Sequence, residues 1–336
     1  MGSLMKFLVI GLGSMGKRRV RNLQALGIKD VAGFDTRADR REEAKQKYGI
    51  AVFEALDDAM KIFLPQAFVI STPPDLHMRY AYYAYENGVS CFIEASVVDA
   101  EKIDELQRKI LGTQIIIAPS CTMRYYQGPK KVKELVKSDA IGRVLNINYQ
   151  TGQYLPDWHP WENIEDYYVS KRSTGAAREI VPFELTWLND IFGQPEALAC
   201  VKAKLTDMTA DIDDIYHCLL RYEGGVIANV TVEVISRPQA CREMRILGSE
   251  GKIVMSGDSN SVRYINTSMV DWAEFKFDAG TVESQYINPE EPYIAEMKDF
   301  VAAVEARDSL LFPNTLAADY EVLQTLNSLE NISIIA

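Results

Sequence analysis

A glycine-rich turn near the amino end constrains the fold of this 336-residue chain more than any other feature. The apolar run 7–10 predicts a buried parallel strand, Gly11, Gly13 and Gly16 follow it, and the next residues predict a helix that ends at Gly27. The first glycine allows a tight turn, the second leaves room for a pyrophosphate, and the third lets helix and strand pack closely. The free N–H groups at the start of such a helix attract phosphate. The pattern therefore predicts a dinucleotide-binding fold.

An acidic residue follows the second predicted strand, residues 31–34. Asp35 comes about 20 residues after Gly16, where dinucleotide-binding folds carry the carboxylate that takes the ribose hydroxyls. A carboxylate there repels a 2′-phosphate, so the expected cofactor is NAD, while Arg37 and Arg40 leave NADP open. The residues predicted to bind the cofactor in this part of the chain are Gly11, Leu12, Gly13, Ser14, Met15, Gly16, Asp35, Thr36, Arg37 and Arg40.

Composition limits the classes of partner. The chain has 36 basic and 47 acidic residues and a formal net charge of −11, which argues against nucleic acid because binding a polyanion needs a basic face. No apolar run approaches the length that crosses a membrane. Five scattered cysteines predict reduced thiols in the cytoplasm, and three histidines without ligand spacing predict no metal site. No secretory signal is visible, and residues 1–4 read as a cloning remnant.

The order of predicted elements divides the chain in two. Strands and helices alternate up to residue 121, which predicts a parallel sheet with right-handed crossovers. Longer alternating segments with hairpin turns follow, which predict a mostly antiparallel sheet with one open face. We therefore expect a Rossmann-type α/β domain over 5–121 and an α+β domain with a large open sheet over 122–336, whose last helix could pack back on the first domain. The open face predicts association into a homodimer or homotetramer.

Several motifs give the chain a family resemblance that covers nearly its whole length. They are the glycine turn, Ser-Thr-Pro-Pro-Asp-Leu-His at 71–77, Phe-Ile-Glu at 92–94 and Gly-Ser-Glu-Gly at 248–251. With them the chain resembles the glucose–fructose oxidoreductase/inositol dehydrogenase/MocA family. The resemblance implies hydride transfer between NAD or NADP on the first domain and a sugar, sugar nucleotide or polyol on the second. It adds these residues to the cofactor site: Ser71, Thr72, Pro73, His77, Glu94 and Ala95.

The chain departs from the family at both usual proton-handling positions. The family's Glu-Lys-Pro is Glu94-Ala95-Ser96 here, and a methyl group cannot replace the amine that helps to remove the hydroxyl proton. The family's later Asp-x-Gly-x-His-x-x-Asp aligns with 179–186, so that Phe183 stands for the histidine and Thr186 for the last acid. Since positioned acid–base groups contribute about 10²–10⁴ in rate, another group must serve if the chain is a dehydrogenase.

Replacement groups are expected in an aromatic segment, 152–161, and its surroundings. His159 has a suitable ordinary pKa, near 6.5, although a surface histidine is an equal reading. Tyr154 and Tyr167 could hold or relay a proton, or only pack. Glu184 could be an acid with a raised pKa, an acceptor for sugar hydroxyls, or the ion-pair partner of an arginine at position 178 or 124. The predicted substrate-binding residues are Arg124, Asp157, Trp158 and Arg178.

Three hypotheses of function follow from these residues. The first is a nicotinamide-dependent oxidoreductase that acts on a carbohydrate-like small molecule. The second is a nucleotide-binding sensor or partner protein that kept the fold and lost the chemistry, as the missing lysine and histidine suggest. The third is chemistry on a tightly held nucleotide that is recycled within the protein.

Overall fold

The computed structural model describes residues 5–160, 162–284 and 286–335, and these form two compact units. The first unit contains the chain up to Thr122 together with 281–283 and 288–320. The second contains 123–280, the short stretch before Asn288, and the chain from Glu321 onward. The helix α9 (Leu316–Asn331) begins in the first unit and ends in the second.

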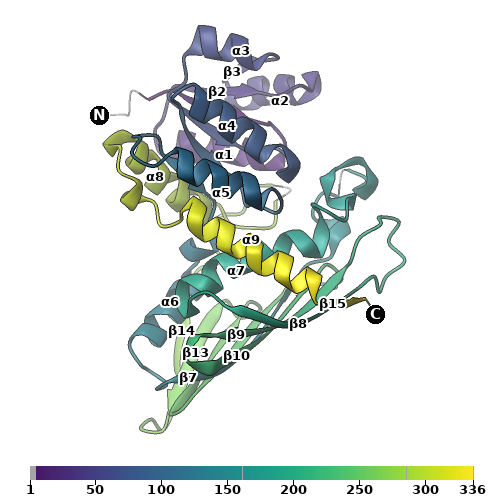
Figure 1. Ribbon diagram of the computed structural model, residues 1–336, viewed down its shortest axis with the longest axis vertical. Helices are drawn as coiled ribbons and strands as arrows, with labels where there is room; N and C mark the ends of the chain where they lie inside the picture. Colours follow the sequence, from purple (N-terminus) through teal and green to yellow (C-terminus); the bar gives the residue numbers. More distant parts are fainter. Residues whose placement is uncertain (1–4, 161, 285, 336) are drawn as a thin grey trace. The chain divides into compact units, whose positions relative to one another are not determined.

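A six-stranded parallel sheet forms the centre of the first unit (Figure 1). Its strands lie in the order β3-β2-β1-β4-β5-β6. This is the Rossmann order, and it confirms the predicted α/β fold of the amino-terminal part. Because the order reverses between β1 and β4, the crevice at their carboxyl ends is the expected ligand site of such a sheet. The strand bounds are β1 (Phe7–Ile10), β2 (Val31–Phe34), β3 (Ala51–Phe53), β4 (Ala67–Ile70), β5 (Ser90–Ile93) and β6 (Ile117–Pro119).

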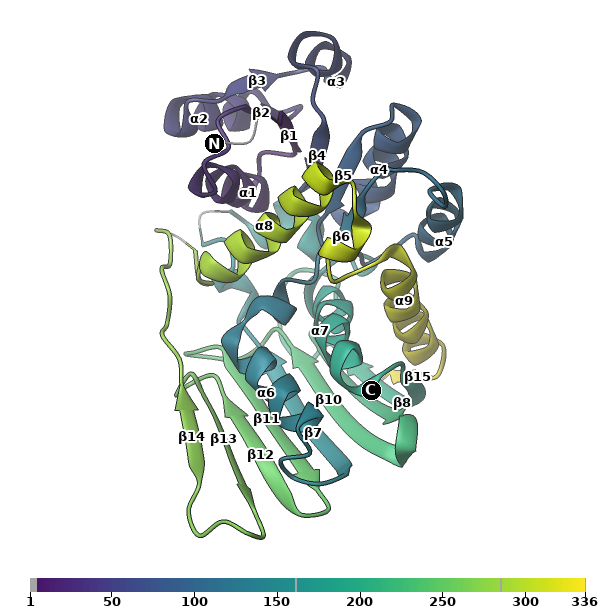
Figure 2. The same cartoon turned by 90° about the vertical axis from the view of Figure 1, so that its left-hand side faces the viewer.

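Helices cover both faces of this sheet. In Figure 2, α1 lies beside α8 on one face, and α4 lies beside α5 on the other. Asp99 precedes α5, but its side chain makes no capping hydrogen bond and its φ is 67°, so the backbone turn rather than the carboxylate begins the helix. The bounds are α1 (Ser14–Ala25), α2 (Ala38–Tyr48), α3 (Leu56–Asp58), α4 (His77–Glu86), α5 (Ala100–Lys109) and α8 (Glu291–Ala306).

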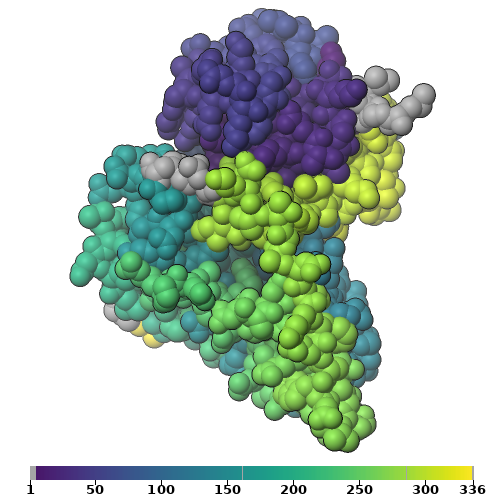
Figure 3. Space-filling view, turned by 180° about the vertical axis from the view of Figure 1, so that it is seen from behind, coloured from purple at the N-terminus to yellow at the C-terminus, as the bar shows by residue number. Residues whose placement is uncertain are grey.

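The helix α8 is part of the first unit. The sequence placed all of 122–336 in the second domain and allowed only the last helix to pack back, whereas 288–320, with α8, belong to the first unit. Phe300 of α8 explains the difference, because its ring contacts Phe7 of β1 and Phe92 of β5, at centroid distances of 6.3 and 5.7 Å. Figure 3 shows α8, in yellow-green, against the purple amino-terminal segment. The aromatic core of the sheet thus needs a residue from late in the chain.

The second unit is built on a nine-stranded sheet in the order β14-β13-β12-β11-β7-β10-β9-β8-β15. Most neighbours are antiparallel, as predicted, while β7 pairs with β10, and β8 with β15, in parallel. The helices α6 (Gln127–Lys137) and α7 (Ala176–Phe192) pack on one face (Figure 2). The strand bounds are β7 (Val144–Gly152), β8 (Glu196–Ala203), β9 (Ile215–Tyr222), β10 (Val226–Glu233), β11 (Cys241–Gly248), β12 (Gly251–Ser256), β13 (Ser261–Asn266), β14 (Ala273–Lys276) and β15 (Ser333–Ile335).

Alternation along β9 fixes which side of this sheet carries the core. Cys218 and Leu220 are buried on the side of α7, while Leu219 and Arg221 point to the other side and are exposed. The sequence predicts a helix over about 181–191, and α7 begins five residues earlier, at Ala176, and passes through Pro182. The longer helix brings Glu179 into the fold of the second unit.

Candidate functional site

The glycine turn after β1 has the geometry that phosphate binding requires. Gly11 has a φ of +87°, and a Cβ there would lie 2.6 Å from the carbonyl oxygen of Ser71. A Cβ at Gly16 would lie 1.7 Å from the carbonyl oxygen of Gly11, so the helix can approach the turn only without a side chain. No side chain caps α1 at Gly13, and its first turn contains no acidic residue. The start of the helix is thus suited to an anionic ligand.

Asp35 lies beside this turn, at the carboxyl end of β2. Its carboxylate is buried and accepts hydrogen bonds from the backbone N–H groups of Leu12, at 2.7 Å, and Arg37, at 2.8 Å. The Arg40 guanidinium lies 3.9 Å from the same carboxylate, whereas the Arg37 side chain pairs with the exposed Asp39. Two backbone donors thus hold the acid next to the turn, as the sequence predicts for a ribose ligand.

Two buried polar atoms without partners lie at the end of β4. His77 is buried, and its Nε2 lies 2.8 Å from the carbonyl oxygen of Thr72. Burial lowers the pKa of His77, so the ring is neutral, donates from Nε2 and leaves Nδ1 as an acceptor. Neither this Nδ1 nor the Thr72 hydroxyl has a hydrogen-bond partner among the described residues. Buried polar groups without partners are rare, so an arriving ligand is a natural explanation.

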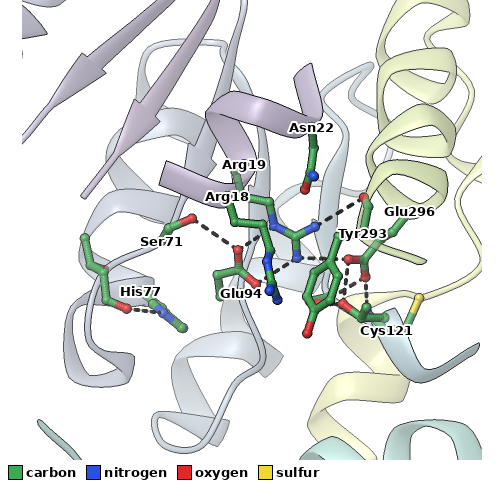
Figure 4. A network of polar contacts seen from close by, with 12 residues as sticks. Arg18, Arg19, Asn22, Ser71, His77, Glu94, Cys121, Tyr293 and Glu296 are labelled. Carbon is green, nitrogen blue, oxygen red and sulfur yellow. Dashed lines mark hydrogen bonds and ion pairs between the residues drawn. The ribbon is translucent and has the colours of Figure 1, made fainter. Parts of the chain in front are cut away.

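A buried ion-pair network fixes the end of β5 (Figure 4). The Arg19 guanidinium, fully buried on α1, donates to both carboxylate oxygens of Glu94, at 2.7 and 2.9 Å, and pairs with Glu296 of α8 at 2.9 Å. Ser71 also donates to Glu94, at 3.1 Å. Glu94 is thus held in place immediately before Ala95. Glu296 in turn accepts from the backbone N–H of Cys121 at 2.6 Å.

The predicted aromatic segment begins at the end of β7 and belongs to a loop between β7 and α7 that contains three short 3₁₀ turns, at 155–157, 164–166 and 168–170. The ring of His159 stacks on Tyr167 at a centroid distance of 4.8 Å, and its Nδ1 lies 3.4 Å from Glu162. Tyr154 lies under the Arg237 guanidinium at 4.1 Å. Burial raises the pKa of Tyr167, and the carboxylates of Glu162 and one further glutamate add to the effect. The loop thus brings His159 and Tyr167 together and leaves Tyr154 in a separate contact. Trp161 lies outside the described residues.

Glu179 is the additional glutamate, and sequence reasoning did not include it among the site residues. The Tyr168 hydroxyl donates to its Oε1 at 2.8 Å, and its Oε2 is buried without a hydrogen-bond partner among the residues described. Burial raises the pKa of Glu179 to about 7, although the bond from Tyr168 lowers it. The signal available in the sequence was its alignment with the first acid of the family's later motif.

Glu184 is fully buried and all its contacts are ionic or hydrogen-bonded. Arg242 of β11 donates to its two oxygens at 2.9 and 2.8 Å, and Tyr149 and Trp187 each donate to Oε2 at 2.7 Å. The predicted ion pair therefore exists with a different arginine. The two arginines named in the sequence bond elsewhere, because Arg124 donates to the carbonyl oxygen of Thr186 and Arg178 pairs with Glu330. This arrangement favours the ion-pair reading of Glu184 over a proton acceptor.

The remaining predicted substrate residues lie on the loop. Asp157 is exposed in a 3₁₀ turn, and Trp158 is half-buried. The indole Nε1 of Trp158 is buried and has no partner within the described part of the chain. Trp158 Nε1 and Glu179 Oε2 are thus a buried donor and a buried acceptor that lack hydrogen-bond partners among the described residues of the second unit.

Comparison with known families identifies the chain. Residues 5–113 match the oxidoreductase family with an NAD-binding Rossmann fold, and residues 130–254 match the GFO/IDH/MocA C-terminal domain. The chain belongs to the Gfo/Idh/MocA oxidoreductase family. None of the curated proteins matches the sequence significantly.

Solved structures share this fold over nearly the whole chain. A levoglucosan dehydrogenase in complex with NADH and levoglucosan has 17% identity and a TM-score of 0.83, with 97% of this chain and 96% of that chain covered. An inositol dehydrogenase homologue with NAD⁺ from Azotobacter vinelandii has 14% identity and a TM-score of 0.79, with 98% and 96% covered. A UDP-N-acetylglucosamine 3-dehydrogenase from Acidithiobacillus ferrooxidans has 19% identity and a TM-score of 0.76, with 98% and 97% covered.

The first unit is therefore an NAD-binding domain of this oxidoreductase family, and its residues fit the cofactor. The tight contacts at Gly11 and Gly16, the uncapped start of α1 and the buried carboxylate of Asp35 suit a pyrophosphate and a ribose. Ser14 and Met15 begin α1, and Thr36 and Pro73 lie in the loops that follow β2 and β4. Within the described ranges, acidic, histidine and cysteine side chains form no cluster that could hold a metal ion, and no helix combines the length and apolarity that a membrane span needs.

Proposed function

We propose that the protein transfers hydride between NAD and a CH–OH group of a sugar, sugar nucleotide or polyol, with NADP as a second cofactor. The observation that carries the proposal is the loop of the second unit. It combines aromatic faces, which pack on sugar C–H groups, with the Trp158 donor and the Glu179 acceptor, both buried and without hydrogen-bond partners among the residues described. The fold neighbours crystallised with levoglucosan or named as inositol and UDP-N-acetylglucosamine dehydrogenases support the same substrate class.

Each unit has a separate task in this proposal. The glycine turn and Asp35 hold the diphosphate and the ribose, and the nicotinamide, when bound, accepts or returns the hydride. The proton of the reacting hydroxyl needs an acceptor from the protein, because Ala95 and Phe183 cannot take it. His159 and Tyr167, stacked in the loop, remain proposed acid–base groups, and Tyr154 a weaker one. Arg124, Asp157, Trp158 and Arg178 remain proposed substrate-binding residues.

The reaction can be tested with purified protein and a defined panel of substrates. NAD⁺ or NADP⁺ is mixed with levoglucosan, L-sorbose, myo-inositol or UDP-N-acetylglucosamine, and the absorbance of reduced nicotinamide is followed. We expect turnover with at least one member, faster with NAD⁺. Binding of NADH without turnover on this panel and a wider set of polyols would refute the proposal in favour of the sensor hypothesis, which the comparisons do not support.

We further propose a cytoplasmic homodimer or homotetramer. Exposed apolar side chains on the strands of the second sheet, such as Leu145, Leu219 and Leu247, support association. Light scattering after gel filtration at micromolar concentration tests this, and a monomer would contradict it.

A further inference from the structure

The carboxylate of Glu179 has two oxygens in different situations. Oε1 accepts from the Tyr168 hydroxyl at 2.8 Å, in a contact between the loop and the first turns of α7. Oε2 is shielded from solvent and has no partner among the residues that the structure describes. A buried acceptor without a donor calls for an explanation, and a donor that arrives with a ligand supplies one. The hydroxyl of a carbohydrate is such a donor.

The titratable groups facing this carboxylate come from the loop. Tyr168 bonds to it directly, and Tyr167 packs edge-to-face against Tyr168 at 6.0 Å. The His159 ring lies on Tyr167, and Glu162 lies beside that ring. Because burial raises the pKa of Glu179 to about 7, both its protonation states exist near neutral pH. A general base works best under that condition.

We infer that Glu179 is the proton acceptor of the reaction, with Oε2 receiving the hydroxyl proton of the substrate while Tyr168 holds Oε1. This inference rests on the proposed hydride transfer. In the oxidation, the C–H bond breaks, and its hydrogen leaves with the electron pair as hydride to the nicotinamide C4. The O–H bond breaks, its proton passes to Glu179, and its electron pair forms the C=O bond. Glu179 then loses the proton to solvent, and the reverse reaction runs these steps backward.

Two other carboxylates of the second unit fit this role less well. Glu184 receives two bonds from Arg242 and one each from Tyr149 and Trp187, which occupy both of its oxygens. Glu162 is already paired with the His159 ring. Glu179 combines a free acceptor oxygen with a fixed orientation, and the unpartnered Nε1 of Trp158 gives the same substrate a donor.

The test compares Glu179→Gln, Glu179→Asp and Tyr168→Phe with a matched control, Glu165→Gln. Glu165 is an exposed carboxylate of the same loop. Rates with the best substrate of the panel are measured from pH 5.5 to 9, together with NADH affinity by calorimetry. A ¹³C NMR titration of labelled glutamate side chains reports the protonation of Glu179 without reference to turnover.

We expect wild-type kcat/KM for oxidation to decrease as the pH is lowered past about 7, because the base must be ionised. The kcat of Glu179→Gln should be at least 100-fold lower than that of wild type, and its pH profile should lack the acidic limb. Its affinity for NADH should stay within twofold of wild type. Glu179→Asp should keep more activity than Glu179→Gln. Tyr168→Phe should move the acidic limb to higher pH. The hydrogen bond from Tyr168 favours the ionised carboxylate, so its loss raises the pKa of Glu179. Glu165→Gln should change nothing, and the NMR midpoint near 7 should be absent from Glu179→Gln.

The outcomes separate this inference from the proposed function. Turnover by wild type together with a rate within fivefold in a Glu179→Gln variant that binds NADH normally would overturn the inference alone. A wild-type NMR midpoint below pH 5 would also overturn it. If wild type binds NADH and turns over nothing, the proposed function fails, and the inference fails with it. Should Glu179→Gln not fold, unchanged pH profiles in Glu179→Asp and Tyr168→Phe would contradict the inference.

Discussion

Replacement of Arg19 by methionine should destabilise the protein severely. The Arg19 side chain is fully buried, and it pairs with Glu94 at 2.7 Å and Glu296 at 2.9 Å, whose side chains are 13% and 0% exposed. Methionine fills a similar volume, so little of the cost comes from a cavity. Removing one partner of a buried ion pair costs about 3–5 kcal/mol, because the remaining charge has no compensation. Here two carboxylates lose the same cation, so we expect a value at the upper end, about 4–5 kcal/mol at pH 8.

Urea unfolding of wild type, Arg19→Met and the exposed control Arg37→Met measures this cost. Arg37 pairs with Asp39 at the surface, and its loss should cost less than about 1 kcal/mol. Burial already raises the pKa of Glu296, and loss of Arg19 should raise it further. A carboxylate with a raised pKa in the folded state stabilises at low pH and loses that contribution as pH rises. The loss of unfolding free energy in Arg19→Met should therefore be smaller at pH 5 than at pH 8. It should also be smaller in the double variant Arg19→Met/Glu296→Gln. A deficit equal to that of Arg37→Met at pH 8 would refute the reasoning.

Three further predictions concern the cofactor and Glu179. Gly16→Ala should weaken NADH binding at least tenfold in calorimetry, because its Cβ would lie 1.7 Å from the carbonyl oxygen of Gly11; an unchanged Kd would contradict the geometry. Asp35→Ser should raise the affinity for NADPH relative to NADH about tenfold, since a charge that repels the 2′-phosphate is gone, and an unchanged ratio would count against that role. Because burial raises the pKa of Glu179 to about 7, wild-type stability should fall by about 2–3 kcal/mol as pH rises from 4.5 to 8. That fall should be smaller in Glu179→Gln, and identical pH profiles of Tm would show that Glu179 titrates normally.

Local patterns made the first unit predictable. The glycine turn, the helix after it and Asp35 lie within 30 residues, and each depends on contacts between near neighbours in the chain. The parallel sheet followed from the alternation of strands and helices and the handedness of their crossovers. The place of α8 did not follow, because Phe300 reaches the core from a segment that no periodicity links to β1 or β5.

The polar networks of both units could not be predicted for the same reason. In the sequence, Arg19 resembles a cation on a helix surface. In the structure it pairs with Glu296, which lies far along the chain. An ion pair with Arg178 or Arg124 was one of three readings for Glu184, but its partner Arg242 comes from a strand whose position depends on the pairing of β7 with β11. Glu179 was left out of the predicted site because the sequence does not show which carboxylate keeps an oxygen without a hydrogen-bond partner among the described residues. Sequence patterns therefore suggested the kinds of group that are present, and tertiary packing decided which of them are paired.

A crystal structure of the protein with NADH and a polyol that it turns over would test the central claim most directly. The account predicts the reacting hydroxyl within hydrogen-bond distance of Glu179 Oε2, with Tyr168 still bonded to Oε1 and the diphosphate at the glycine turn. A substrate whose reacting hydroxyl meets another group, with Glu179 beyond the reach of one bridging water, would contradict it.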